Sequence, residues 1–395
     1  MNTTSTSARR SDPADPPGFR LYREIRRLME TDAEDCVIEA RIARFAAGAR
    51  RMALADRDDL RRTESLFRRA SDSLKRRVYP ILVEALGAEG LSEKLNIYAQ
   101  RAGTDLAPVC SFTAAMSLRA RRRQALPETA AELYLIDKDD GGRFARALGV
   151  PVARRDTALY DWRELPLEPG TVVKPRNGEG SRGVFVIRTE AEVLEIKTGT
   201  WLSGGVSALR PRIAHLVGTG FVPRDRWIRE DFVTEDPATG ALARDFKVFA
   251  FYGDCPLIWE MIRQPTTAAC WWGPDGRAVD AGQLFSYYPH FDGIGFPPAV
   301  LDLARRISRE IPAPFLRLDI LNGHDGPVLG EFTGHSGNYD RMNREWDRRL
   351  GEAFLAAEAR LHADLIRGRR FDTFLSCFPT YGAPPGPAIF PRHAS

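Results

Sequence analysis

The chain changes its hydrophobic spacing once, near Pro127. Over residues 21–126, apolar side chains recur every three to four positions, with arginines between them. This period predicts amphipathic helices, because residues three and four apart lie on one helix face. Beyond Pro127, short runs rich in β-branched and aromatic residues alternate with helical ones. We therefore expect mostly antiparallel sheets with flanking helices, an α+β arrangement.

The sequence after Pro127 predicts both helices and strands. Its β-rich runs are short, as is typical of strands. Helices are expected at 141–148, 298–310 and 342–367. Strands are expected at 133–136, 150–153, 171–174, 183–188, 227–233, 244–252, 257–263, 315–321 and 327–332.

The two ends differ from the rest of the chain. The first residues are rich in Thr, Ser, Asp and Pro without an apolar run, so we expect a disordered leader and no secretory signal. Repeated prolines predict a loop or extended arm at 378–395. The predicted division is a leader at 1–18, a helical domain at 19–126, a catalytic unit at 127–370 and a tail at 371–395.

Charge and cysteine content narrow the class of protein. The chain has 57 basic and 53 acidic residues, a formal net charge of +4, which is too mild to predict nucleic-acid binding. No run of 18 apolar residues exists, so we expect no membrane-spanning helix. The five cysteines are far apart without a Cys-x-x-Cys pair, which predicts reduced thiols in a cytoplasmic protein.

Arginine clusters carry most of the positive excess. They lie at 61–62, 68–69, 76–77 and 119–123. We interpret them as solvated helix faces. The alternative is a surface of the helical domain that docks an anionic partner, such as membrane headgroups.

A glycine-rich loop follows a predicted strand that ends in Lys174-Pro175. Glycines let a backbone curl so that amide groups face a phosphate, and a lysine adds a point charge. The lysine precedes the glycines, which excludes a P-loop, and a plain hairpin is the competing interpretation. The candidate phosphate-binding residues are Lys174, Gly178, Gly180, Ser181 and Gly183.

Two acidic residues, Asp319 and Glu331, lie in neighbouring predicted strands joined by an Asp-Gly turn. Pairing of these strands would let both carboxylates point to one face. Crowded carboxylates repel unless a cation joins them, and hard oxygen ligands that share a nucleotide phosphate are typical of Mg²⁺. The alternative is that Asp319 forms an ion pair with Arg317 or Arg263.

Two further strands combine charged and apolar residues. The run 227–233 ends with acidic residues beside apolar ones, which suits a connector that reads an adenine edge and holds a ribose. In the other, Asp245 and Lys247 alternate with apolar residues and therefore share one face of the strand. Plain surface strands show both patterns as well.

In order and spacing, these motifs resemble the ATP-grasp superfamily. The phrases Asp245 to Gly253 and Gly330 to Gly337 are most similar to TupA-like ATP-grasp proteins, a family associated with polysaccharide-linked peptide synthesis. The resemblance spans about residues 133–354. It implies an ATP-grasp fold, in which two α+β lobes grip ATP, preceded by a mainly α-helical N-terminal domain.

The resemblance also implies ATP and Mg²⁺ as cofactors and a role for each matching residue. The implied roles are phosphate binding for Lys138 and Lys174, the adenine hinge for Glu230 and Val233, the ribose for Asp245, the γ-phosphate and acyl phosphate for Lys247 and Arg263, and magnesium for Asp319 and Glu331.

One position departs from the superfamily pattern. Many ATP-grasp ligases carry Glu-x-Asn with the Asn as a third metal ligand, whereas this chain has Glu331-Phe332-Thr333, a Thr that TupA-like sequences share. Asn338 is the substitute ligand that we consider. Nearby His335 either touches substrate or bonds to the backbone of its turn, and the turn role is the commoner one.

These implied roles point to a ligase. A carboxylate would attack the γ-phosphoryl group, basic residues and Mg²⁺ would neutralise the two anions, and an amine would displace phosphate from the acyl phosphate. The partners would be a small-molecule acid and an amine, in cell-surface polysaccharide, peptide or secondary-metabolite biosynthesis. A non-catalytic ATP-binding scaffold or sensor, and a sugar or lipid kinase, are the alternatives.

An aromatic run lies between the sheet strands and the helix at 298–310. It comprises Trp271, Trp272, Tyr287, Tyr288 and Phe291. These rings would line an acceptor pocket or stack on sugars, and packing against the sheet is the commoner alternative.

Overall fold

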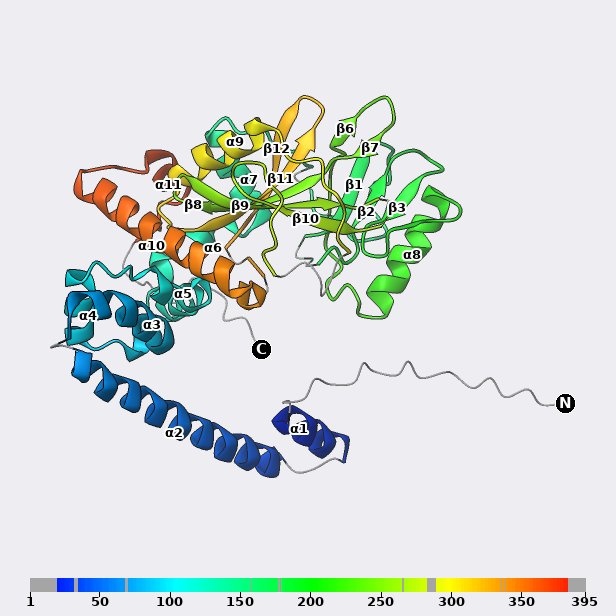
Figure 1. Cartoon of the computed structure of the whole chain (residues 1–395). Coiled ribbons are helices and arrows are strands. Elements are labelled where there is room, and N and C mark those ends of the chain that lie inside the picture. The colour runs from blue at the N-terminus through cyan, green and yellow to red at the C-terminus, as the bar shows by residue number, and fades with distance from the viewer. Residues whose placement is uncertain are drawn as a thin grey trace. The chain divides into compact units, whose positions relative to one another are not determined.

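The computed structural model describes residues 20–31, 35–67, 70–156, 158–176, 178, 180–264, 266–282, 289–334, 336–337 and 339–382. The predicted leader, His335, Asn338 and the tail beyond residue 382 lie outside these residues. The chain forms two compact units, Met1–Val109 and Cys110–Ser395, each of which is described by itself (Figure 1).

The first unit is helical, as predicted. It contains α1 (Arg20–Glu30), α2 (Asp35–Phe67), α3 (Asp72–Gly90), α4 (Glu93–Arg101) and the short 3₁₀ helix η1 (Ala107–Val109). The side chains of Ser71 and Ser92 accept hydrogen bonds from the first turns of α3 and α4, which satisfies backbone donors that would otherwise lack partners. A small core around Tyr79, Val83 and Leu95 holds α3 against α4.

The second unit begins with helices that precede its sheets. These are α5 (Phe112–Ala125), η2 (Pro127–Thr129), α6 (Ala131–Leu135) and α7 (Lys138–Ala147). The strand predicted at 133–136 is wrong, because most of this segment belongs to α6. Buried Ala131, Glu132 and Leu135 show helical spacing, and a short apolar run does not reveal its period from sequence alone.

Two further sequence interpretations need correction. The predicted strand at 150–153 is only an isolated parallel bridge between Val152 and Leu329. In the arginine cluster at 119–123, Arg119 does not lie on a solvated face: only 4% of it is exposed, and its Nη2 lies 2.8 Å from Glu132 Oε2. A buried guanidinium needs such a partner, and the sequence around Arg119 does not reveal it.

A five-stranded antiparallel sheet follows in the chain. Its strand order is β4-β3-β2-β1-β5, and α8 (Val206–Gly218) packs on one face through Leu209, Ile213 and Leu216. The strands are β1 (Thr171–Pro175), β2 (Phe185–Ile187), β3 (Val193–Glu195), β4 (Thr200–Trp201) and β5 (Trp227–Asp231). Helix α8 was not predicted, because Pro211 interrupts the helical pattern.

The central sheet is the second five-stranded antiparallel sheet, with strand order β10-β9-β8-β11-β12. Its strands are β8 (Asp245–Phe251), β9 (Asp254–Ile262), β10 (Ala268–Trp272), β11 (Leu316–Gly323) and β12 (Gly326–Thr333). The hairpin of β6 (Thr234–Asp236) and β7 (Ala241–Leu242) lies between the two sheets in the sequence. The later helices are α9 (Pro298–Arg309), η4 (Tyr339–Arg341), α10 (Arg344–Ile366) and α11 (Asp372–Cys377).

The packing interpretation of the aromatic run holds for Trp271. This residue lies in β10, is fully buried, and stacks on Trp259 with ring centroids 5.0 Å apart and planes at 14°. Trp272 donates its Nε1 hydrogen to Glu260 Oε2 at 2.7 Å. Phe291 packs partly buried against the same core, and Tyr287 and Tyr288 lie outside the described residues.

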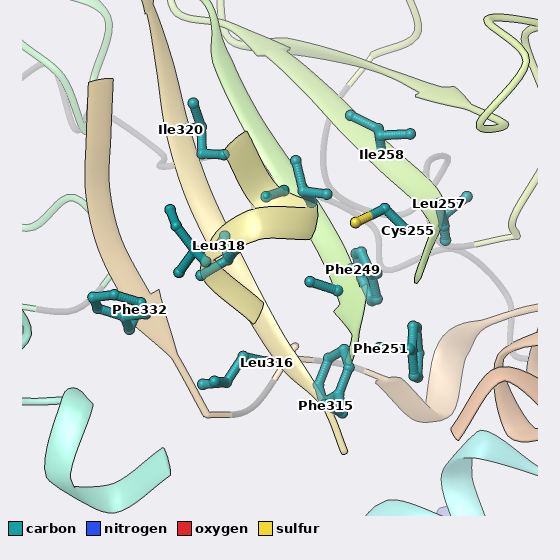
Figure 2. Close-up of a cluster of buried hydrophobic side chains, with 14 of the residues drawn as sticks. Phe249, Phe251, Cys255, Leu257, Ile258, Phe315, Leu316, Leu318, Ile320 and Phe332 are labelled. Atoms are coloured by element: carbon teal, nitrogen blue, oxygen red, sulfur yellow. The ribbon is translucent and has the colours of Figure 1, made fainter. Parts of the chain in front are cut away.

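Alternation along β11 gives the central sheet two different faces. Leu316, Leu318 and Ile320 are apolar and lie in line along the strand (Figure 2), in the main core together with residues of α9. Arg317 and Asp319 lie between them in sequence and therefore point to the opposite face. The fold thus carries charged side chains on one face of a buried sheet. In the part of the chain that the structure describes, no helix is long and apolar enough to cross a membrane.

Candidate active site

A row of charged residues crosses the central sheet. Lys247 of β8 lies directly opposite Asp319 of β11, and Asp319 lies directly opposite Glu331 of β12. Directly opposed residues of paired strands share a face, so the two acids lie on the same face, as predicted. The β-bulge after Asp319 locally disturbs the strand pairing at this point.

Asp319 is buried, with 5% of the residue exposed, and fully paired. Arg317 donates from Nε to Oδ1 at 2.7 Å and from Nη2 to Oδ2 at 2.9 Å, and Lys247 Nζ lies 2.5 Å from Oδ2. Burial acts to raise the pKa of Asp319, but the charges of Arg317 and Lys247 outweigh it and hold the pKa well below its ordinary value. Asp319 is therefore a stable carboxylate.

Glu331 differs from Asp319 although the two are neighbours. Within the described ranges, its carboxylate forms no hydrogen bond and no ion pair. Burial, and after it the charge of Asp319, raise the pKa of Glu331, while Lys247, Lys138 and Arg317 act against the rise. A cation bound beside Asp319 and Glu331 would offset the repulsion between their two negative charges. The donor set therefore fits a divalent ion with oxygen ligands.

The charged row continues from Lys247 to Asp245 in the same strand and from there to Arg263. Asp245, with 8% of the residue exposed, accepts contacts from Lys247 Nζ at 3.0 Å and from Arg263 Nη2 at 2.9 Å. Arg263 follows β9. Acidic and basic groups thus alternate from Arg263 through Asp245, Lys247 and Asp319 to Arg317. This alternation lets five charged side chains share a buried face with little net repulsion.

Lys138 connects this row to the first sheet. It is the first residue of α7, whose N-cap Asp137 accepts hydrogen bonds from the Asp139 and Asp140 amides. Burial, and after it the charge of Lys174, lower the pKa of Lys138, while Glu331 and Glu230 act in the opposite direction. These influences put Lys138 within electrostatic reach of both sheets. No ion pair of Lys138 is found within the described ranges.

Lys174 and Glu230 form an ion pair across the first sheet, between β1 and β5. Val233 lies two residues after β5, in the connection to β6, and is partly buried. The predicted hinge residues are therefore at the exit of the first sheet. The backbone there is tied to a neighbouring segment, because Asp231 donates its amide hydrogen to the Arg154 carbonyl at 2.8 Å.

The glycine-rich loop lies next to Lys138 in the fold. Its first residue, Arg176, contacts the carboxylates of Asp137 at 3.2 Å and Asp139 at 3.0 Å, the two residues that flank Lys138. Gly178, Gly180, Ser181 and Gly183 are described, and the last three have φ near +60° to +68°. At Gly183 a Cβ would lie 2.8 Å from the Val222 side chain, so only glycine fits there.

Arg317 is the site residue that the sequence interpretation missed as a functional group. Besides Asp319, it donates to the Ser336 carbonyl at 2.9 Å and to Thr333 Oγ1 at 3.1 Å. The signal was present, because Arg317 lies two residues before Asp319 and shares its face of the strand. The Thr333 hydroxyl is thus engaged by Arg317. Asn338 lies outside the described residues, and its role as third ligand stays a prediction.

The described residues contain no group of three or more His, Cys, Asp or Glu side chains that could hold a metal ion by themselves. Asp319 and Glu331 would supply two ligands, and a nucleotide phosphate would have to supply others. The basic residues that act electrostatically on Glu331 are Lys247, Lys138 and Arg317, whereas Lys174 pairs with Glu230 and Arg263 pairs with Asp245.

Solved structures with a similar chain path include ATP-grasp ligases. A D-alanine–D-alanine ligase from Bacillus anthracis, complexed with ATP, has 12% identity and a TM-score of 0.33, over 64% of this chain and 67% of that one. The ATP-grasp ligase PsnB, complexed with a minimal precursor, has 16% identity and a TM-score of 0.32, over 67% and 72%. An ATP-grasp RimK domain protein from Sphaerobacter thermophilus has 14% identity and a TM-score of 0.32, over 56% and 67%. Likenesses this weak carry no argument.

Comparison with curated proteins found no match. The model of the TupA-like ATPgrasp family matches residues 116–355, more than half of the chain. The match confirms the predicted fold class, an ATP-grasp fold preceded by helices. The chain belongs to the TupA-like ATP-grasp family.

Proposed function

We propose that this protein is an ATP-dependent carboxylate–amine ligase that acts through an acyl phosphate. The observation that carries the proposal is the row of Lys247, Asp319 and Glu331 on one buried face, with Lys138 nearby. It combines two acids, one of them without a partner among the described residues, with basic groups on both sides.

The residues fit magnesium and a nucleotide triphosphate. Asp319 and Glu331 would hold the ion, which when bound supplies charge neutralisation and a fixed orientation of phosphate oxygens. The carboxylate of Glu331, which has a raised pKa and no partner among the described residues, is the group that gains most from a bound cation. Lys138 and Lys174 would hold phosphates, Glu230 and Val233 the adenine, and Asp245 the ribose.

The chemistry proposed begins with two anions that repel each other. A substrate carboxylate oxygen attacks the γ-phosphorus of ATP, the bond to the β-phosphate oxygen breaks, and ADP leaves. Lys247 and Arg263 lower the barrier because their fixed charges face the phosphoryl group as its charge shifts. Asp245 holds both basic groups in place from between them.

The second step forms the new bond. An amine nitrogen attacks the carbonyl carbon of the acyl phosphate, the bond from carbon to the phosphate oxygen breaks, and inorganic phosphate leaves with a proton lost from nitrogen. The acyl phosphate must be kept from water, and the loop 176–183 would serve as the lid. Its tie to Asp137 and Asp139 through Arg176 supports this role, because it brings the loop to Lys138.

The test is product analysis of the purified protein. ATP, Mg²⁺ and a panel of amino acids and uronic acids are supplied, and ADP and phosphate are measured separately. A ligase releases both products only when acid and amine are present together. A sugar or lipid kinase releases ADP without phosphate, and an ATP sensor or scaffold releases neither. Either of these results contradicts the proposal.

We further propose that the product belongs to cell-surface polysaccharide, peptide or secondary-metabolite synthesis. Membership of the TupA-like family supports this setting. Isolation of the ligated product from cells that express the chain, compared with cells that lack it, is the measurement that checks it.

A further inference from the structure

A polar pocket outside the charged row lies in the second unit. Its volume is about 420 Å³, within the range of small-molecule sites. It is formed where α9 and α10 end, beside the turn that joins β8 to β9. Its lining residues are Arg309, Ala359, Arg360, Ala363, Asp364 and Arg367.

The charge of this pocket is unbalanced. Three guanidinium groups line it and only one carboxylate, that of Asp364, so the lining has two positive charges in excess. Arg309 Nη2 lies 3.4 Å from Asp364 Oδ2, and Arg367 Nη1 lies 3.9 Å from Oδ1. Neither contact is a short bidentate salt bridge, so both guanidinium groups keep donors for a ligand.

Of the three lining arginines, Arg360 is the one whose charge is not balanced by a carboxylate among the described residues. Its Nη2 donates to the Phe251 carbonyl at 2.7 Å, and within the described part of the chain it has no carboxylate partner. Each guanidinium has five N–H donors, so most donors around the pocket are still available.

The ends of α9 and α10 do not account for all this charge. Arginines are common at helix C-termini because they complement the macrodipole. Here Arg369 does so for α9: its Nη2 donates to the Arg309 carbonyl at 2.7 Å and lies 3.1 Å from Glu310 Oε1. The three lining arginines come in addition to this capping residue.

Tyr252 and Gly253 form the two-residue turn between β8 and β9, and Tyr252 is fully buried. Their φ values, +43° and +92°, are both positive, as a type I′ turn of a two-residue hairpin requires. The Tyr252 hydroxyl donates to Asp364 Oδ2 at 2.9 Å. The Tyr252 ring lies under the guanidinium of Arg309, 5.6 Å from its centroid.

We propose that this pocket binds a phosphate-bearing ligand. Guanidinium groups match the oxygens of phosphate in pairs, and an excess of two charges suits a dianionic group better than a single carboxylate. Asp364, whose carboxylate accepts a hydrogen bond from Tyr252, reduces the positive charge of the pocket. The ligand is a free phosphorylated molecule or a phosphorylated lipid headgroup, and both present the same chemistry.

The pocket is separate from the charged row. Lys247 lies five residues before Tyr252, the residue that bonds to Asp364, roughly 16 Å along the chain at the rise of an extended strand. A ligand here would not contact Lys247, Asp319 or Glu331. The inference therefore does not depend on the proposed ligase activity.

The first experiment is calorimetric titration of inorganic diphosphate into the full chain. The titrated chain carries Lys138→Gln and Lys174→Gln, which remove two basic groups of the candidate active site. We expect one saturable site per chain at physiological salt. Adding Arg309→Gln, Arg360→Gln and Arg367→Gln should weaken its affinity at least tenfold. A matched control, Arg277→Gln with Arg348→Gln and Arg349→Gln, removes the same charge elsewhere and should leave the affinity unchanged.

A second variant distinguishes the loss of ligand contacts from the loss of the fold. Asp364→Asn removes the only acidic group of the pocket and keeps its size, so it should strengthen diphosphate binding several-fold. Damage to the structure would not produce a gain. Weaker binding in Asp364→Asn, equal loss in the control variant, or no saturable diphosphate site contradicts the proposal.

The source of the phosphate is decided by vesicles. Vesicles of phosphatidylcholine with one fifth phosphatidic acid are sedimented with the full chain and with the triple pocket variant. Binding that is lost in the variant assigns the pocket to a lipid headgroup, and diphosphate binding without vesicle binding assigns it to a free ligand. Failure of both probes overturns the inference.

Discussion

The two faces of the central sheet are built from the same strands and differ in every other respect. On β11, Leu318 and Ile320 are fully buried in the main core, whereas Arg317 and Asp319 belong to a charged row. The apolar face needs only volume and hydrophobicity, since many substitutions of similar shape satisfy it. The charged face needs particular partners in register, because a buried charge without one is costly. Stability and proposed chemistry are thus separated by the alternation of a single strand.

The sharpest way to break this comparison is to remove the charge of one acid on the charged face. Asp319→Asn keeps the shape of the side chain and should lower magnesium-dependent turnover at least a hundredfold, about 2.7 kcal/mol in the barrier. Phosphate release with saturating substrates measures it. Glu331→Gln should cause a loss of the same order. Full rate in either variant would show that the metal assignment is wrong.

A cavity on the apolar face should lower stability and leave nucleotide binding unchanged. Leu318→Ala removes buried methyl groups and should lower the free energy of unfolding by about 2–5 kcal/mol. The protein that remains folded should bind ATP as the parent does, because the altered side chain points away from the charged row. Urea unfolding and nucleotide titration measure the two quantities. Leu318→Met, which conserves volume, is the matched control and should change neither the free energy of unfolding nor the nucleotide affinity appreciably.

Within the charged face, the two acids should affect stability in opposite directions. The lowered pKa of Asp319 means that it stabilises the fold at neutral pH and that this contribution is lost as pH falls through the folded-state pKa. The raised pKa of Glu331 favours its protonated form, so its contribution is present at low pH and is lost as pH rises through the folded-state pKa.

At pH 7 without nucleotide or metal, Asp319→Asn should therefore lower the melting temperature and Glu331→Gln should raise it. The gain from Glu331→Gln should shrink toward pH 4. Thermal unfolding at several pH values measures both effects. A stabilising Asp319→Asn, or a Glu331→Gln that is destabilising at neutral pH, contradicts the electrostatic description of the row.

The smallest effect should come from Thr333. Its hydroxyl accepts a hydrogen bond from Arg317, so Thr333→Val removes one partner of that guanidinium and leaves both oxygens of Asp319 paired. We expect a loss of roughly 1 kcal/mol in stability and a change in the apparent magnesium affinity of less than threefold. Titration of magnesium against phosphate release measures it. A tenfold weaker magnesium affinity would make Thr333 a metal ligand.

Sequence predicted the parts of this fold that local pattern determines. The strands that became β1, β8, β9, β11 and β12 were expected because their residues alternate or form β-rich runs, and the shared face of Asp319 and Glu331 followed from the turn between them. The helix α6 was mistaken for a strand because its apolar run is too short to show a period. Strand β10 was missed because Trp271 is buried by tertiary packing, which spacing does not reveal.

Partner choice within the charged row was predicted only in part. The sequence offered an ion pair of Asp319 with Arg317 or Arg263 as the alternative to a metal, and Asp319 pairs with Arg317 and also with Lys247, which was not predicted as its partner. Which basic residue meets which acid depends on the pairing of β8 with β11, strands that lie far apart in the chain. Arg119 was taken for a surface residue for a different reason: its partner Glu132 is close in sequence, but the packing that buries both residues is not visible in the helical spacing.

Direct binding of metal and nucleotide tests the central claim most closely. Mn²⁺ as a probe for Mg²⁺ is titrated into the full chain with a non-hydrolysable ATP analogue, and bound Mn²⁺ is read by electron paramagnetic resonance. We predict one tightly held ion that requires the nucleotide, and a loss of this binding in both Asp319→Asn and Glu331→Gln, with the Leu318→Met control unchanged. Bound Mn²⁺ that persists in both acid variants would contradict the account.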